Sequence, residues 1–156
     1  MRTPVLLAAL AALALPLAAH AQAQDKTINV APGDPAINAA VARAKRELPV
    51  FFGHVGAPGP GEDHFMIKYD VQPGAPVEYV WAEVISHANA QSAAKLVNAS
   101  NDGRFKVGLQ VRINDAEIVD WGYRKDGVMQ GNYTTRVLLT RIPESEAAPV
   151  RKYLGW

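Results

Sequence analysis

Residues 105–114 read FKVGLQVRIN, and an apolar side chain occupies every second position from Phe105 to Ile113. This alternation predicts a β-strand that buries one face and exposes the other. The same pattern occurs in residues 65–71 and 77–86, and shorter strands are predicted over residues 94–98 and 118–123. Alternating strands favour a mainly antiparallel sheet of about five strands, with one covered face, over a fully buried parallel sheet.

An amphipathic helix is predicted over residues 34–48, and we expect it to pack on this sheet. Asp34 can accept hydrogen bonds from the free N–H groups of the first turn, and Pro35 is tolerated at the first helical position. Pro49 is expected to end the helix, because proline has no backbone N–H to donate. Residues 57–63 are rich in proline and glycine and predict a loop. The apolar side chains recur at helical spacing, at Ile37, Val41, Ala44 and Leu48.

The C-terminal part of the sequence leaves two interpretations open. Residues 133–139 are rich in Thr and Val and fit either a strand or the start of a helix. Pro143 and Glu144 indicate the start of a possible C-terminal helix, although Pro149 falls within it. A helix, then consecutive antiparallel strands, then a possible second helix predicts an α+β fold.

The first 21 residues have the three parts of a cleavable signal peptide. Arg2 precedes an apolar run over residues 5–19, and the small side chains of Ala19 and Ala21 predict cleavage after residue 21. The run is shorter than the roughly 20 residues that a membrane-spanning helix needs. We therefore expect a flexible leader over residues 22–33 and a single domain over 34–156. The mature domain is expected in the periplasm or outside the cell, without membrane insertion after signal cleavage.

Composition excludes several kinds of chemistry. The chain has no cysteine, which rules out disulfides and thiol catalysis. Its 16 Lys and Arg residues nearly balance 15 Asp and Glu residues, so we expect no nucleic-acid partner. We also expect no cofactor. His54, His64 and His87, with Glu62 and Asp63, do not have the spacing of a closed metal site, and no metal is expected.

Two groups of residues are candidate ligand-binding sites. The aromatic side chains of Trp81, Trp121 and Tyr133 are either a recognition platform or part of the core, and the core interpretation is favoured. The charged side chains form the second group: Glu78, Asp120, Arg136 and Lys68. They either bind a polar ligand or stabilise the sheet through ion pairs and bonds to backbone N–H groups, and the second use is the commoner one. No nucleophile motif is present, and no catalytic residue is assigned.

Several motifs, in a fixed order along the chain, resemble the YegJ-like family of bacterial domains of unknown function. The resemblance implies a compact domain with an antiparallel sheet and implies no catalytic residues. Residues 93–100 depart from the pattern, because relatives tend to have a glycine and a proline there. The matching pieces are a helix ending near Phe51-Phe52, FMIKY at 65–69, EYVW at 78–81, Gly108, IVDW at 118–121, Gly127 and GNYTTR at 131–136.

The leading functional hypothesis is a non-enzymatic binding module of the bacterial cell envelope, whose partner is a protein or a small envelope molecule. A protein that neutralises a toxin or hydrolase is a special case. The alternative is an enzyme that uses Glu78 or Glu83 together with Asp120, which requires these carboxylates to converge in one cleft. A third reading is a structural role within the envelope.

Overall fold

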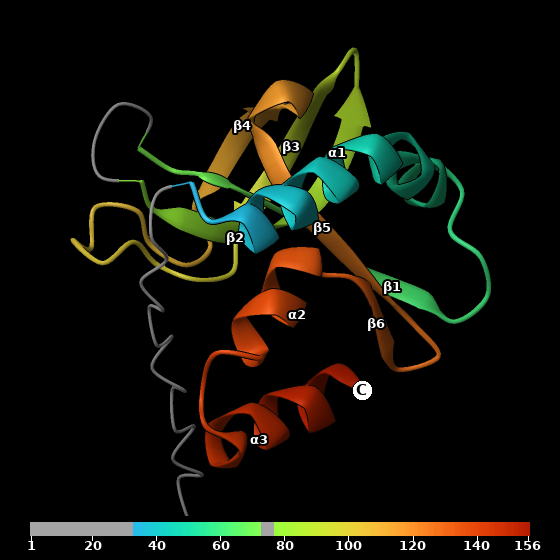
Figure 1. Cartoon of the computed structure of the whole chain (residues 1–156). Coiled ribbons are helices and arrows are strands. Elements are labelled where there is room, and N and C mark those ends of the chain that lie inside the picture. Colours follow the sequence, from blue (N-terminus) through green and yellow to red (C-terminus); the bar gives the residue numbers. More distant parts are fainter. Residues whose placement is uncertain (1–32, 73–76) are drawn as a thin grey trace, which may run out of the picture.

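The computed structural model describes residues 33–72 and 77–156, and within these ranges it contains three α-helices and six β-strands (Figure 1). The six strands form one sheet in the order β4-β3-β2-β1-β5-β6, and every neighbouring pair is antiparallel. This confirms the α+β prediction, with one strand more than expected. The strands are β1 Glu62–Asp70, β2 Tyr79–Ala88, β3 Gln91–Leu96, β4 Gln110–Asn114, β5 Ile118–Lys125 and β6 Val128–Gly131. The helices are α1 Pro35–Gly56, α2 Tyr133–Leu139 and α3 Glu144–Leu154, with a 3-10 turn at Asp115–Glu117.

Helix α1 begins where the sequence predicts and ends later. Asp34 Oδ1 accepts hydrogen bonds from the backbone N–H groups of Ala36 and Ile37, each at 3.0 Å. The prediction that Pro49 ends the helix is wrong, because α1 continues through it to Gly56. A proline inside a helix costs about 3 kcal/mol, but the continuation buries Phe51 completely and brings further apolar side chains onto the sheet.

The main core lies between α1 and one face of the sheet. Alternate residues of the central strands point towards α1, including Ile67 in β1, Ala82 in β2 and Trp121 in β5, which are neighbours in the register. In Figure 1, α1 crosses the front of the sheet, whereas α2 and α3 lie below it, near the end that holds β6. A second, smaller core contains Met129, Leu139, Ala147 and Leu154.

The opposite face of the sheet is divided into two parts. At the β5–β6 end, Met66 of this face packs against the smaller core formed with α2 and α3. Over β1 to β4 the same face carries exposed or half-buried side chains, among them Tyr79 with 45% of its surface exposed. We call this part of the sheet, on the side away from α1, the open face.

Other boundaries correct the sequence predictions. Only the second half of FKVGLQVRIN is a strand, because Gly108 adopts φ +86° and Leu109 N–H donates to Lys106 O at 3.1 Å, which makes a turn. The predicted loop over 57–63 is shorter, since β1 starts at Glu62. Residues 133–139 form a helix, one of the two interpretations left open, and the C-terminal helix is confirmed.

Some predictions fall on parts of the chain that the structure does not describe. The signal peptide over residues 1–21 and most of the leader over 22–33 lie outside the described residues, as do residues 73–76 between two of the predicted strands. In the part of the chain that is described, no helix combines the length and the apolar character that crossing a membrane requires.

Candidate functional site

The Asp120 carboxylate is fully buried beneath the open face, where β5 meets the start of α2. It accepts hydrogen bonds from the backbone N–H groups of Trp121 at 2.9 Å, Tyr133 at 3.1 Å and Thr134 at 2.8 Å. The Thr134 hydroxyl donates a further bond, with an oxygen–oxygen distance of 2.6 Å. Burial raises the pKa of Asp120, while the bonds from Thr134 act in the opposite direction. Asp120 therefore fixes the first turn of α2, as the structural interpretation predicts.

Lys68 is connected to this carboxylate through one hydroxyl group. Its Nζ donates to Thr134 Oγ1 at 3.2 Å, and the same hydroxyl donates its single proton to Asp120. Lys68 and Asp120 are cross-strand partners on β1 and β5. The positive charge of Lys68 lowers the pKa of Asp120, which partly offsets the effect of burial.

Two aromatic rings of β2 lie near the ammonium group of Lys68 on the open face. Nζ lies 5.5 Å from the ring centroid of Trp81 and 6.0 Å from that of Tyr79, within the range of cation–π attraction. Trp81 is half-buried and is the register partner of Lys68, while Tyr79 is exposed. We call Lys68, Tyr79, Trp81, Thr134 and Asp120 the Lys68 cluster.

Trp121 and Tyr133 lie on the other side of the sheet, against α1. Trp121 is 5% exposed, its Nε1 donates to Ala44 O at 2.9 Å, and its ring stacks on Phe51 at 5.2 Å. Tyr133 meets Trp121 edge-on at 5.5 Å and donates its hydroxyl to Glu47. Burial and the neighbouring Glu47 carboxylate raise the pKa of Tyr133 to about 12. These rings join α1 and α2 to the sheet and leave little surface for a ligand.

The side chain of Arg136 lies beside the C-terminal residue, Trp156. Its Nε donates to Gly131 O at 3.0 Å and its Nη2 to Met129 O at 3.3 Å. Its guanidinium carbon lies 3.8 Å from the ring centroid of Trp156. Arg136 thus ties α2 and the last residue to β6.

Glu78 is placed in the loops before β2. Its carboxylate accepts from Asn101 N–H at 2.5 Å and from Gln72 Nε2 at 3.4 Å. Glu83, the other carboxylate of the enzyme hypothesis, faces Lys95 at 3.7 Å. Each of these carboxylates has its own local partners, and none of them shares a hydrogen-bond partner with Asp120.

The histidines are distributed over separate pairs. His54 contacts Glu62 at 2.9 Å, His64 contacts Asp63 at 2.8 Å and His87 contacts Asp115 at 3.0 Å. The ring of His87 also stacks on Phe52 at 3.5 Å. Over residues 33–72 and 77–156, no three His, Asp or Glu side chains gather as a metal site requires.

A sequence model of a protein family matches residues 34–156, and its description reads "uncharacterized protein conserved in bacteria (DUF2314)". The chain belongs to this family. The match confirms that the domain is a conserved bacterial one of unknown function, and the whole Lys68 cluster lies within it. No curated protein and no solved structure matches the chain.

Of the predicted site residues, the structure brings together Lys68, Trp81 and Asp120. Tyr79 was not among the predicted site residues, although it lies two positions before Trp81 and therefore on the same strand face. Strand parity was the signal that could have added it. Thr134 had no such signal, because its position depends on where α2 packs, 66 residues along the chain from Lys68.

Proposed function

We propose that this DUF2314 chain is a YegJ-like, non-enzymatic binding module that is exported to the bacterial cell envelope and holds a partner protein on its open face. The observation that carries the proposal is the Lys68 cluster, in which one ammonium group lies within cation–π range of an exposed tyrosine and a half-buried tryptophan. Tyrosine and tryptophan side chains are enriched at protein interfaces and contribute much of the binding energy there.

The surroundings of Asp120 support binding over acid–base catalysis. A general acid or base has to exchange a proton with a ligand, which requires an accessible carboxylate oxygen. Both oxygens of Asp120 accept hydrogen bonds from the chain, and the residue is fully buried. Asp120 therefore acts on the open face indirectly, by holding Thr134 and through it the ammonium group of Lys68.

The chemistry of the cluster selects the kind of partner segment. The ring of Tyr79 offers apolar contact area, and the ammonium group of Lys68 attracts a carboxylate or carbonyl oxygen. A protein segment that carries an acidic side chain beside an apolar one satisfies both groups. If the captured partner is a toxin or a hydrolase, the binding module would be a protein that neutralises it.

Affinity capture with matched variants tests the partner site. Tagged protein is used to recover its partner from envelope extracts, and the variants are Tyr79→Ala, Trp81→Ala and Lys68→Met. The control is Tyr153→Ala, which removes a tyrosine ring that is 70% exposed on α3. We expect one near-stoichiometric protein that the control retains and the three variants lose, with melting temperatures showing that all remain folded.

Two results would reject this site. Retention of the partner by both aromatic variants would remove the Lys68 cluster from the interface. An empty capture would exclude a stable protein partner, and a thermal-shift screen of envelope sugars and peptides would then test a small ligand at the same residues.

Export is tested separately. The support for it is the order of Arg2, the apolar run over residues 5–19 and the small residues Ala19 and Ala21. Mass spectrometry of the protein from fractionated bacteria should find the N-terminus at residue 22 in the periplasm or medium. A chain in the cytoplasm that retains Arg2 would contradict export.

A further inference from the structure

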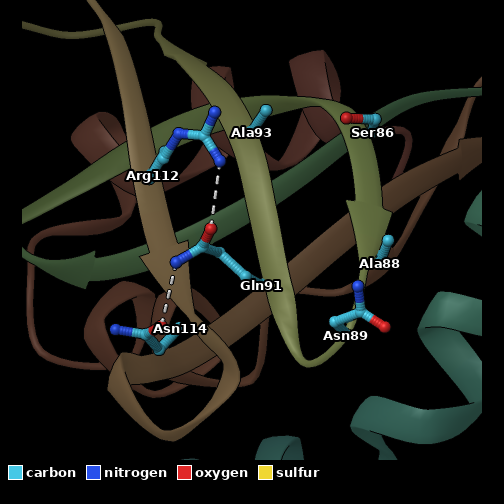
Figure 2. A pocket seen from close by; sticks show the side chains of 7 residues that line it. All are labelled: Ser86, Ala88, Asn89, Gln91, Ala93, Arg112 and Asn114. Carbon is cyan, nitrogen blue, oxygen red and sulfur yellow. Dashed lines mark hydrogen bonds between the residues drawn. The ribbon is translucent and has the colours of Figure 1, made fainter.

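A second feature of the open face lies at its β4 end. There β2, β3 and β4 border a hollow of about 360 Å³, shown in Figure 2. The small side chains of Ala88 and Ala93 leave room in it, and Arg112 and Gln91 stand at one side, with Ser86 and Asn89 at the other. None of these residues belongs to the Lys68 cluster.

A directed chain of hydrogen bonds orders one side of the hollow. Arg112 Nη1 donates to Gln91 Oε1 at 3.2 Å, and Gln91 Nε2 donates to Asn114 Oδ1 at 3.2 Å (Figure 2). Asn114 Nδ2 then donates to Glu117 Oε2 at 3.1 Å. Every donor points the same way, from the cation towards the anion, so the bonds polarise one another and orient both amide groups.

Arg112 itself has no ion-pair partner in the part of the chain that the structure describes. The bond to Gln91 uses one of the five N–H donors of its guanidinium group. By contrast, Lys95 on the neighbouring strand faces Glu83 at 3.7 Å. The hollow is therefore bordered by one uncompensated positive charge and several neutral polar groups.

We propose that this hollow binds the carboxylate of a small ligand of amino-acid or dipeptide size. The planar fork of a guanidinium group matches a carboxylate through two parallel hydrogen bonds. One positive charge among neutral amides and a serine balances a singly charged carboxylate, whereas a phosphate dianion requires more cations. Pockets for small molecules measure about 300–1,000 Å³, so the volume here suits a ligand at the small end of that range.

The remaining groups fit the body of such a ligand. Ser86 and Asn89 offer a hydroxyl and an amide to a peptide bond, and the methyl groups of Ala88 and Ala93 leave space for a small side chain. This inference goes beyond the proposed function and does not rest on it, because the hollow and the Lys68 cluster have no residue in common.

A matched pair of ligands tests the proposal. Isotope-labelled protein is titrated with acetyl-Ala-Ala, which ends in a carboxylate, and with the same dipeptide closed by an amide, while amide chemical shifts are followed by NMR. We expect saturable shifts in β3 and β4 around Arg112 with the acid and none with the amide. Arg112→Gln should weaken binding about tenfold or more, since bonds between charged groups are the strong ones.

Further variants control for charge and for folding. Lys152→Gln removes an exposed charge from α3 and should leave the affinity unchanged. Ala93→Leu fills the hollow without altering any charge and should abolish the chemical-shift changes. This variant still tests the site if Arg112→Gln disturbs the structure of β4.

Several outcomes would overturn the proposal. Equal binding of the acid and the amide, unchanged affinity in Arg112→Gln, or no saturable shift up to the solubility limit would each reject a carboxylate site here. Tighter binding of inorganic phosphate would reject the ligand class. Shifts confined to Lys68 and Trp81 would reject the hollow while supporting the Lys68 cluster, so failure of one proposal is distinguishable from failure of the other.

Discussion

Thr134 Oγ1 lies 2.6 Å from Oδ2 of Asp120, and this bond joins the start of α2 to the middle of the sheet. The backbone N–H of Thr134 donates to the same oxygen at 2.8 Å. The first N–H groups of a helix have no partner within the helix, and the Asp120 carboxylate satisfies two of them in α2. Because the Thr134 hydroxyl also accepts from Lys68, one side-chain pair connects β5, α2 and β1.

We expect Asp120→Asn to lower the free energy of unfolding by about 3 kcal/mol. Asparagine keeps only one of the two oxygens, and Tyr133 and Thr134 donate to different ones, so the new NH2 group would face one of these backbone N–H groups and that buried donor would lose its acceptor. Urea denaturation measures the change. The control is Asp126→Asn, which changes an exposed residue in a turn. Its free energy of unfolding should stay within about 0.5 kcal/mol of that of the parent protein. Equal stability of the two variants would show that the buried bonds contribute little.

The pH dependence of stability should depend on Glu62. Its side chain is 1% exposed, and bonds from Gly59 N–H at 2.9 Å, His54 at 2.9 Å and Lys125 at 3.2 Å hold its pKa at about 2. A carboxyl whose pKa is lower in the folded state stabilises the fold above its ordinary pKa of 4.5, and this stabilisation is lost as the pH falls from there to about 2. The free energy of unfolding, measured by urea denaturation at several pH values in this range, should decrease less with falling pH in Glu62→Gln than in the parent protein. An equal decrease in both proteins would contradict the role of Glu62.

The central strands could be predicted from the sequence because one of their faces is covered and the other is not. That condition produces the alternation seen in β1 and β2, where Ile67 and Ala82 meet in the core, whereas β5 is buried on both faces. It does not determine how far a strand extends, and half of the stretch with the clearest alternation is a turn at Gly108.

The candidate site was only partly predictable for a related reason. Parity places Trp81 and Lys68 on the open face, but no local sequence pattern distinguishes the half-buried Trp81 from Trp121, which α1 covers. The link through Thr134 forms only after α2 has packed beside β5. Contacts between residues distant in sequence determine these parts of the site, and a single sequence carries no local pattern for them.

Gly131 should not tolerate alanine. Its φ is +68°, and an added Cβ would lie 2.4 Å from the backbone oxygen of Trp121 and 2.6 Å from its ring. Gly127 is a close control, since its φ is +81° and an added Cβ would meet nothing within 4 Å. We expect Gly127→Ala to cost about 1–2 kcal/mol from backbone strain alone and Gly131→Ala to cost clearly more. Thermal denaturation of the pair separates the steric clash from the strain, and equal losses would show that both the backbone oxygen and the ring of Trp121 move aside easily.

Pro49 lies inside α1, at the point where the sequence predicts the end of the helix. Proline removes one helical hydrogen bond and disfavours a helix interior by about 3 kcal/mol. The helix nevertheless continues, because Phe51 is fully buried against Trp121 at 5.2 Å and Phe52 stacks on His87 at 3.5 Å. The side chain of Pro49 is exposed and contributes no core packing.

Pro49→Ala should therefore raise the free energy of unfolding by about 1–3 kcal/mol, since it restores the missing donor without removing a buried contact. Pro35→Ala is the matched control, because the first position of the same helix has no helical bond to restore, and its effect should stay within about 0.5 kcal/mol. Urea denaturation of both variants measures the difference. A loss of stability in Pro49→Ala would show instead that the proline sets the path of α1, so that Phe51 and Phe52 reach Trp121 and His87 only through a local distortion that a regular helix lacks.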